Sequence, residues 1–230
     1  MANVLITGAN RGIGLEFAQQ FIARGDRLFA ACRDIENALE LRQLQQTQPT
    51  LELLELDVSR IESMENLARQ LQDEAIDIFI NNAGVYGPRD AEFGNVDASA
   101  WASVLQVNTI APLLLSQLLI EPLRRGRDRK MLYLTSKMGS IDDNKGGGSY
   151  IYRSSKAALN AVVKSLAVDL TGEGFSIAVL HPGWVRTDMG GANGLIDTAT
   201  SVSGMIGVID GLDSSQSGSF FNYDGSIIPW

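Results

Sequence analysis

Residues 8–14 read Gly8–Ala9–Asn10–Arg11–Gly12–Ile13–Gly14, and this glycine-rich stretch decides the predicted fold. It follows the apolar run Val4–Ile6 and precedes the amphipathic segment Leu15–Ala23, so we expect a strand, a tight turn and a helix. Glycines let a phosphate approach bare backbone, and the first N–H groups of the helix have no partner within it. The stretch therefore predicts a dinucleotide site. The alternative is a glycine-rich turn that binds nothing, because short glycine motifs recur by chance.

The rest of the chain alternates strand and helix patterns. The predicted strands are Asn3–Thr7, Leu28–Cys32, Leu51–Asp57, Ile76–Asn81, Lys130–Thr135, Phe175–Leu180 and a last one near Ser219–Asn222. The predicted helices are Gly12–Arg24, one from Asp34 or Asn37 to about Gln48, one capped by Ser59 that ends near Asp73, Trp101 to about Arg124, and Tyr152–Leu170. A loop-rich segment is predicted over Pro182–Gly211. This order predicts one α/β domain over residues 1–230, with a single doubly wound parallel sheet of the Rossmann type and helices on both faces.

Composition excludes several classes of protein. The chain has 27 acidic and 19 basic side chains and a net charge of −8, which argues against non-specific nucleic-acid binding. The single Cys32 cannot form an internal disulfide, and the single His181 argues against a His-rich metal site or a Ser-His-Asp triad. No signal peptide and no run of roughly 18 apolar residues is found. We therefore expect a cytoplasmic protein with no membrane, metal or nucleic-acid partner.

Tyr152 and Lys156 form a second pattern, four residues apart in a predicted helix, where such positions share a face. A free tyrosine has a pKa of about 10 and is a poor acid–base catalyst near neutrality. A neighbouring ammonium stabilises the phenolate and lowers that pKa, so the pair makes a usable proton donor for a carbonyl oxygen. A surface pair without chemistry is the alternative, since the spacing is common. Tyr150 has Ser154 in place of the lysine.

Three further positions lie near predicted strand ends or break a helical pattern. Ser136 ends a strand, and its hydroxyl is suited to bond a substrate carbonyl, with Ser140 as the competing candidate. Asn81–Gly84 follows another strand, where small residues admit a nucleotide and amides tie neighbouring strands together; an ordinary turn is the alternative. Asn108 interrupts an apolar helix, which predicts either a local break whose carbonyl holds a water or a satisfied buried amide.

Five motifs occur in the order Thr7–Gly14, Asn81–Gly84, Ser136, Tyr152–Lys156 and Pro182–Gly183. Together they resemble the short-chain dehydrogenase/reductases over nearly the whole chain, and within that family the carbonyl-reductase-like members. The resemblance implies an oxidoreductase that transfers a hydride between a nicotinamide and a carbonyl or alcohol substrate, such as an aldehyde, ketone or quinone.

The resemblance also implies a role for each residue. Tyr152 would be the acid in carbonyl reduction and the base in alcohol oxidation, and Lys156 would lower its pKa and bond the nicotinamide ribose. Ser136 would orient the carbonyl, and Asn108 would hold the water of a proton relay. The implied cofactor-binding positions, besides Tyr152 and Lys156, are Gly8, Asn10, Gly12, Ile13 and Gly14 around the pyrophosphate, Asp57 and Val58 at the adenine, Asn82, Ala83 and Gly84 along the ribose, and Pro182, Gly183, Val185 and Thr187 at the nicotinamide.

The cofactor is predicted from the end of the second strand. An acidic residue there would bond the adenosine ribose and repel a 2′-phosphate, but this sequence has Cys32 followed by Arg33. Arg11 lies in the glycine turn, and two guanidinium groups suit a phosphate dianion. The sequence therefore predicts NADP(H). Asp34 is the counter-argument, since it lies 20 residues past Gly14, and we interpret it as a helix-capping residue.

The remaining expectations concern the lid, the oligomer and the alternatives. The segment near 188–211 consists of small residues and predicts a short mobile substrate lid. The helices Trp101–Arg124 and Tyr152–Leu170 are apolar around much of their circumference, and the resemblance suggests that they pair across a two-fold axis in a homodimer or homotetramer. A nucleotide-binding signalling or regulatory protein of the same fold is the alternative function. A nucleotide-sugar epimerase fits less well, because the chain looks too short for a sugar-binding domain.

Overall fold

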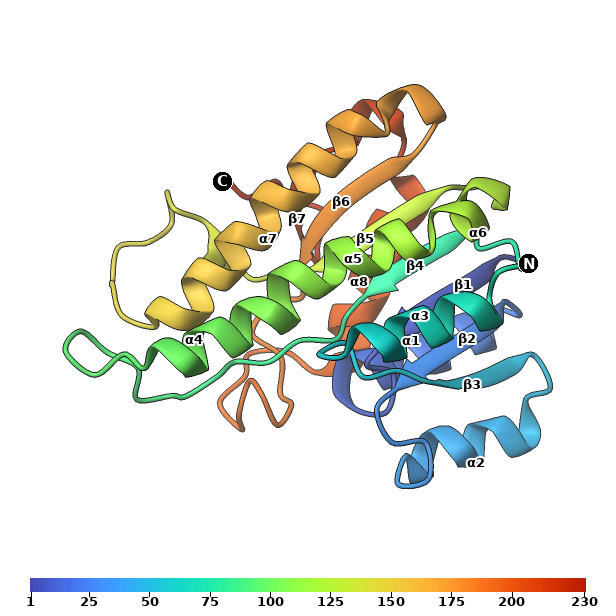
Figure 1. The fold of residues 1–230 in the computed structure, drawn as a ribbon, viewed down its shortest axis with the longest axis horizontal. Coiled ribbons are helices and arrows are strands. Elements are labelled where there is room, and N and C mark those ends of the chain that lie inside the picture. Colours follow the sequence, from blue (N-terminus) through green and yellow to red (C-terminus); the bar gives the residue numbers. More distant parts are fainter.

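Seven strands form one sheet in the order β3-β2-β1-β4-β5-β6-β7, in a computed structural model that describes residues 1–230 (Figure 1). The strands are β1 Asn3–Thr7, β2 Arg27–Cys32, β3 Leu51–Glu55, β4 Ile78–Asn81, β5 Lys130–Leu134, β6 Ser176–His181 and β7 Ser219–Asn222. Every neighbouring pair of strands is parallel. The predicted doubly wound α/β fold is confirmed.

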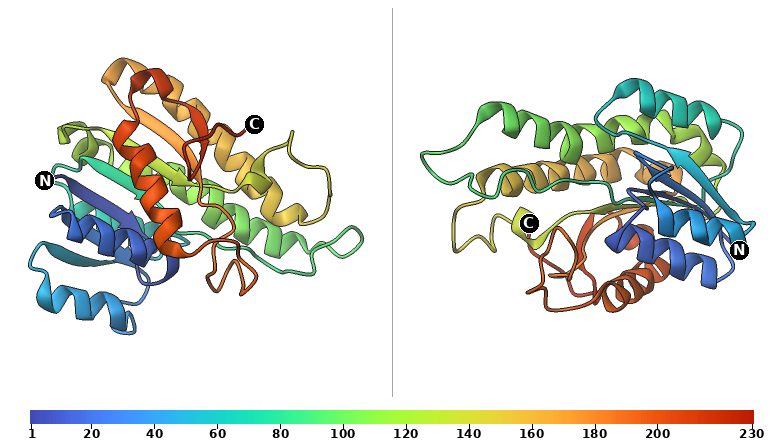
Figure 2. Two further views of the ribbon diagram at one scale, coloured as in Figure 1. Left: turned by 180° about the vertical axis from the view of Figure 1, so that it is seen from behind. Right: turned by 90° about the horizontal axis from the view of Figure 1, so that it is seen from below.

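Helices cover both faces of this sheet, as the view from below in Figure 2 shows. The helices are α1 Gly12–Ala23, α2 Leu39–Thr47, α3 Ile61–Gln70, α4 Ala98–Leu105, α5 Ala111–Leu118, α6 Ile120–Arg125, α7 Tyr150–Asp169 and α8 Thr198–Gly211. Buried side chains of α1, α2 and α8 pack on one face, and those of α3, α5 and α7 pack on the other.

The central strands are buried on both faces, which explains why they are continuous apolar runs rather than alternating ones. In β1, Val4 and Ile6 pack toward α1 and α8, while Leu5 packs toward α3 and α7. All three are fully buried. Burial of each such side chain contributes roughly 1.5–3 kcal/mol. The apolar strands therefore fix the sheet as the rigid support of the loops at its carboxyl edge.

The winding direction of the chain reverses between β1 and β4, which are neighbours in the sheet although they are not consecutive. Val4 pairs with Ile78, and Ile6 pairs with Ile80. The segment after β1 leads to α1 on one face, whereas the segment after β4 leads to α4 on the other face (Figure 1). Such a reversal opens a crevice at the carboxyl ends of the strands, where ligands bind in sheets of this kind.

Helix α8 corrects the prediction of loop over the whole of Pro182–Gly211. The carboxylate of Asp197 caps α8 by accepting the Thr200 N–H at 2.8 Å. Val202 and Met205 lie three residues apart and are fully buried against the sheet. The many Gly, Ser and Thr residues of α8 weaken the helical pattern in the sequence, which explains the error. A lid within 188–211 is therefore restricted to the residues before α8, and its motion stays a prediction.

The helix predicted over Trp101–Arg124 is interrupted twice. It begins earlier, at Ala98, and a π-helical turn over Gln106–Ile110 separates α4 from α5. A short break then separates α5 from α6. Pro112 and Pro122 lie in the first turns of α5 and α6, where the missing N–H of proline costs little. The two prolines therefore mark the beginnings of α5 and α6.

Taken together, α4, the π-helical turn and α5 form a continuous helical stretch over Ala98–Leu118. This stretch is long and apolar enough to cross a membrane, judged by length and composition only. About a third of it is buried in the molecule, where it lies along α7. A core helix of a soluble protein passes the same test. Ile110, in the π-helical turn, is 45% exposed. The stretch thus leaves an apolar surface uncovered in the single chain.

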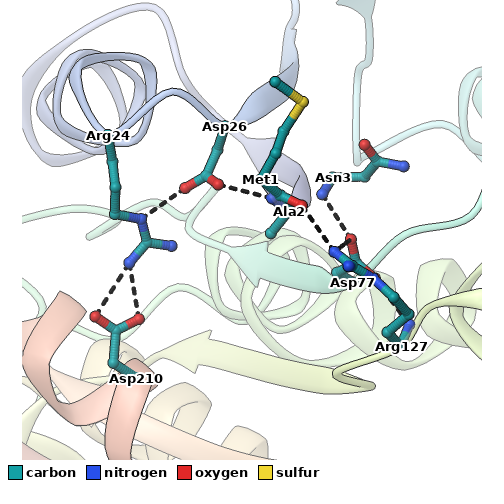
Figure 3. A network of polar contacts seen from close by, with 8 residues as sticks. All are labelled: Met1, Ala2, Asn3, Arg24, Asp26, Asp77, Arg127 and Asp210. Atoms are coloured by element: carbon teal, nitrogen blue, oxygen red, sulfur yellow. Dashed lines mark hydrogen bonds and ion pairs between the residues drawn. The ribbon is translucent and has the colours of Figure 1, made fainter.

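Two buried carboxylates tie the amino ends of the strands together (Figure 3). Asp26 accepts the Ala2 N–H at 2.7 Å, and Asp77 accepts the N–H groups of Asn3 and Arg127, both at 2.8 Å. Burial raises the pKa of Asp77, but these donors and the Arg127 guanidinium outweigh burial and hold the pKa below its usual range. This edge is opposite the strand ends at which ligands bind, so the network stabilises the fold.

Candidate active site

The glycine turn brings bare backbone to the start of α1. Gly12 has a φ of +54°, and a side chain on Gly14 would collide with the Gly8 carbonyl. Arg11 occupies the N-cap position, but no side chain caps the helix. The first N–H groups of α1 are therefore free of a side-chain partner and suit an anion. These residues fit the pyrophosphate of a dinucleotide.

Asn82 ties the loop after β4 to the glycine turn. Its Nδ2 donates to the carbonyls of Thr7 and Gly8, at 2.9 and 3.0 Å, and the Thr7 hydroxyl accepts the N–H groups of Asn82 and Ala83. The expectation that amides here join neighbouring strands is confirmed. A Cβ added to Gly84 would lie 3.2 Å from Asn108 Oδ1. The same loop therefore runs from the glycine turn to the catalytic candidates.

The side chains of Ser136, Tyr152 and Lys156 lie close together at the carboxyl edge of the sheet. Tyr152 and Lys156 lie on successive turns of α7, and Ser136 follows β5. Their side chains are all buried, with residue exposures of 8% or less. Lys156 Nζ donates to the Leu134 carbonyl at 2.9 Å and lies 5.9 Å from the centroid of the Tyr152 ring. The predicted catalytic cluster is thus assembled from two elements that are adjacent only in the fold.

The protonation of this cluster differs from the sequence-based expectation. Burial raises the pKa of Tyr152 to about 12, the hydrogen bond with Ser136 opposes this shift, and Tyr86 adds to it. Burial also lowers the pKa of Lys156 to about 8. A lowered tyrosine pKa was expected, but burial disfavours the phenolate and raises the pKa instead. Lys156 directs its hydrogen bond to a carbonyl rather than to the phenol.

Asn108 lies in the π-helical turn and is almost fully buried. Its Oδ1 accepts the Val85 N–H at 2.9 Å, and its Nδ2 donates to the Val85 carbonyl at 2.8 Å and to Ser155 Oγ at 3.0 Å. The side chain is therefore a satisfied buried amide, one of the two alternatives, and the local break of the other alternative is present as well. A water on its backbone carbonyl stays a prediction.

The two candidate serines point to different partners. Ser136 lies beside Tyr152, and its Oγ also accepts the Met138 N–H at 3.1 Å. Ser140 donates to the Trp230 carbonyl at 3.3 Å and accepts the Asp143 N–H. Only Ser136 contacts the predicted acid–base residue. Its role toward a substrate stays a prediction.

Two of the residues predicted to bind the adenosine part of the cofactor, Asp57 and Arg33, lie near each other. Asp57 accepts the N–H and the hydroxyl of Ser59, so Ser59 forms this turn instead of capping α3, which begins at Ile61 without a side-chain cap. Burial raises the pKa of Asp57, but the Ser59 bonds and the charges of Arg33 and Arg60 lower it overall. Arg33 is therefore near Asp57 at the ends of β2 and β3.

Asp34 and Arg11 have partners within the protein. Asp34 accepts both the backbone N–H and the side-chain amide of Asn37, at 3.0 and 2.6 Å, so it caps a turn before α2 rather than α2 itself. Arg11 pairs with Asp188 at 2.6 Å, and both side chains are largely exposed. The predicted juxtaposition of Arg11 with Arg33 is therefore replaced, in this structure, by a contact between Arg11 and the segment after β6.

The segment after β6 lies against the glycine turn. A Cβ on Gly12 would lie 3.4 Å from Thr187 Cγ2, and Thr187 Oγ1 accepts the Gly190 N–H. Val185 is buried and pairs with Ile196, which folds the segment back on itself. Pro182 and Gly183 connect it to the sheet. The residues predicted to bind the nicotinamide thus lie next to the glycine turn predicted to bind the pyrophosphate.

A cavity of about 410 Å³ lies beyond the ends of β5, β6 and β7, beside the catalytic candidates and not over them. Its lining includes Lys137, His181, Trp184, Asn222, Tyr223 and Ile228. Burial and the Lys137 charge lower the pKa of His181 to about 4, and its Nδ1 has no partner. The single histidine is thus neutral and separate from the Ser136–Tyr152 pair.

Sequence reasoning missed the contact between Tyr86 and Tyr152. The two rings stack with a centroid distance of 4.4 Å and an interplanar angle of 24°. The only signal in the sequence is that Tyr86 follows Asn81–Gly84 closely, and an aromatic residue near a rim is more often packing.

Comparison with known proteins agrees with this geometry. The short chain dehydrogenase family model matches residues 2–195. A protein named C-signal, from Myxococcus xanthus, is 46% identical over 155 residues, which are 67% of this chain and 93% of the relative. The carbonyl reductase Sniffer of D. melanogaster superposes with a TM-score of 0.95 and 35% identity over 100% of both chains. An NADPH-bound carbonyl reductase from chicken fatty liver gives a TM-score of 0.94 and 34% identity, over 100% of this chain and 94% of that one. The chain belongs to the short-chain dehydrogenase/reductase family of oxidoreductases and resembles its carbonyl reductases.

Proposed function

We propose that the protein is an NADP(H)-dependent carbonyl reductase that acts on aldehydes, ketones or quinones. The observation that carries the proposal is the buried cluster of Ser136, Tyr152 and Lys156 at the carboxyl edge of the sheet, next to an uncapped helix N-terminus. The carbonyl reductases among the similar structures support the substrate class, and the one with bound NADPH supports the cofactor.

Each catalytic candidate has a distinct task in this proposal. Tyr152 gives its phenolic proton to the carbonyl oxygen, and Ser136 donates a hydrogen bond to the same oxygen. Lys156 would hold the nicotinamide ribose and stabilise the phenolate that remains. When bound, the nicotinamide supplies the hydride. Burial keeps the phenol of Tyr152 protonated at neutral pH but makes it a weaker acid. In this proposal the Lys156 ammonium offsets that loss by stabilising the phenolate as the proton leaves.

The cofactor preference is tested by a screen of carbonyl compounds with NADPH and with NADH, in which nicotinamide absorbance is followed. We expect turnover with NADPH to exceed turnover with NADH. Arg33→Ala should raise the KM for NADPH by on the order of tenfold or more and leave that for NADH nearly unchanged, because in this proposal its guanidinium would bind only the 2′-phosphate. Arg42→Ala, on exposed α2, is the matched control. Equal efficiency with NADH would refute the proposed preference.

A nucleotide-binding signalling protein is the second candidate, favoured by the name of the relative from Myxococcus xanthus. Such a protein needs the nucleotide site but no acid–base residue. A substitution that removes only the phenolic hydroxyl of Tyr152 separates the two candidates.

We also propose a homodimer or homotetramer. The uncovered apolar surface of Ala98–Leu118 lies beside α7, which exposes Val168 as well. Pairing of these helices across a two-fold axis would cover that surface in water. Light scattering at micromolar concentration should give a multiple of the 24.9 kDa chain mass. A monomer mass would overturn this proposal and leave the enzymatic one intact.

A further inference from the structure

Tyr86 is the aromatic residue that covers the proposed acid–base tyrosine. It belongs to the segment after β4, and its ring is stacked on Tyr152 at 4.4 Å between centroids. Tyr152 is 8% exposed, and Tyr86 is half-buried. A stacked partner of this size keeps water from the ring it covers and restricts rotation of that ring. Tyr86 thus acts directly on the side chain that gives the proton.

Ser149 fixes the hydroxyl end of Tyr86. The two hydroxyl oxygens lie 3.1 Å apart. Ser149 is the N-cap residue of α7 and has a φ of 48°, in the left-handed region that non-glycine residues rarely occupy. Its side chain does not cap α7. A residue with a strained backbone, such as Ser149, persists only where its surroundings hold it. Tyr152 lies three residues further along α7. The bond from Tyr86 therefore joins the beginning of the catalytic helix to the loop after β4.

Arg89, three residues further along the same segment, lies over the ring of Tyr86 and is itself held by a third segment. Its guanidinium carbon lies 5.3 Å from the Tyr86 centroid, and its Nη2 donates to the Met189 carbonyl at 2.8 Å. Met189 belongs to the segment after β6 that lies against the glycine turn. Besides its stack on Tyr152, Tyr86 therefore has two further contacts, one with the Ser149 hydroxyl and one with the Arg89 guanidinium. These contacts fix the orientation of its ring.

We propose that Tyr86 is a positioning residue for Tyr152: its stacked ring holds the phenol in the orientation that places the hydroxyl beside Ser136, and keeps water from that side. This rests on the proposed acid–base role of Tyr152. The groups that face the phenol are the hydroxyl of Ser136 from the segment after β5, Lys156 from the same helix, and Tyr86 itself. Burial is the main cause of the raised pKa of Tyr152, and a charge interaction with the Tyr86 phenol adds to it.

The test uses Tyr86→Leu, which removes the stack, and Tyr86→Phe, which keeps the stack but loses the bond to Ser149. With a carbonyl substrate and NADPH, we expect Tyr86→Leu to lower kcat about tenfold while KM changes by less than about twofold, because proton donation depends on alignment. The pH profile should move to lower pH as water reaches the phenol. Tyr86→Phe should recover most of kcat. Tyr150→Leu, at the exposed first residue of α7, is the matched control.

A second measurement works without turnover. In protein labelled with ¹³C at tyrosine Cζ, the Tyr152 signal is assigned by its absence from Tyr152→Phe and followed by NMR to alkaline pH. We expect its pKa to fall from about 12 toward the ordinary value in Tyr86→Leu and to stay high in Tyr86→Phe. An unchanged pKa with unchanged kcat in Tyr86→Leu refutes the positioning role, as does a change in KM alone. A wild-type protein inactive on every carbonyl refutes the proposed function instead, and the NMR titration still decides the role of Tyr86.

Discussion

Tyr152→Phe is expected to lower carbonyl reduction by about 10²–10⁴-fold while NADPH binding stays within about twofold of wild type. The substitution removes one hydroxyl from a buried ring and leaves the stack on Tyr86 in place. No other titratable group with a proton to give is hydrogen-bonded to Ser136, so no neighbour replaces the phenol. Steady-state kinetics give the loss of rate, and nucleotide fluorescence gives the affinity.

Tyr150→Phe is the control for this experiment, because Tyr150 lies on the same helix but is 39% exposed. It should retain wild-type activity. If Tyr152→Phe retains turnover, the proposed chemistry is wrong and the nucleotide site alone survives. If the biological activity of the protein persists in a catalytically dead Tyr152→Phe, the signalling candidate is correct.

Lys156→Met is expected to lower turnover by at least about 10²-fold and yet leave the folded protein as stable as wild type, or more stable, at neutral pH. Lys156 is buried, and its recorded hydrogen bond goes to the Leu134 carbonyl. Methionine has a similar length and carries no charge into the core. The free energy gained by removing a buried ammonium offsets the free energy lost with the hydrogen bond to the Leu134 carbonyl. Denaturant unfolding measures the second effect, and kinetics measure the first.

The pH dependence of this stability has a definite sign. The pKa of Lys156 is about 8 in the folded protein and 10.5 in its ordinary state. Between these values the unfolded chain holds the proton that the folded chain has released, so the wild-type free energy of unfolding rises with pH through that window. Lys156→Met should lack this rise. Lys164→Met, on the exposed side of α7, should keep it. Equal pH dependence in Lys156→Met and wild type would contradict a charged, buried Lys156 at neutral pH.

The fold was predictable because its signals are local or periodic. The order of strand and helix patterns predicts the parallel sheet, and the glycine turn predicts the start of α1. Helix α8 was missed because Gly, Ser and Thr dilute its apolar spacing, although Asp197 and Val202 show the cap and the core face once they are placed. The breaks between α4, α5 and α6 lie close to Asn108 and the two prolines, but their exact positions are not given by the sequence pattern.

The sequence predicted which candidate side chains come together, but it did not predict their electrostatics. The spacing of Tyr152 and Lys156 predicts that they share a helix face, and it contains no information about how deeply the core buries them. Burial depends on contacts such as the stack with Tyr86, which come from a distant part of the chain. The direction of the tyrosine pKa shift therefore had to come from the structure.

The arrangement of the carboxyl edge also bears on how such an enzyme can diversify. The groups proposed for the chemistry lie just after β5 and on the buried face of α7, whereas the segments 85–97 and 184–197 have much of their surface in solvent. Surface loops accept insertions and exchanges that buried strands do not. New preferences for different carbonyl compounds can therefore evolve in these two segments outside Tyr86, while the residues proposed for proton transfer stay the same from one descendant to the next.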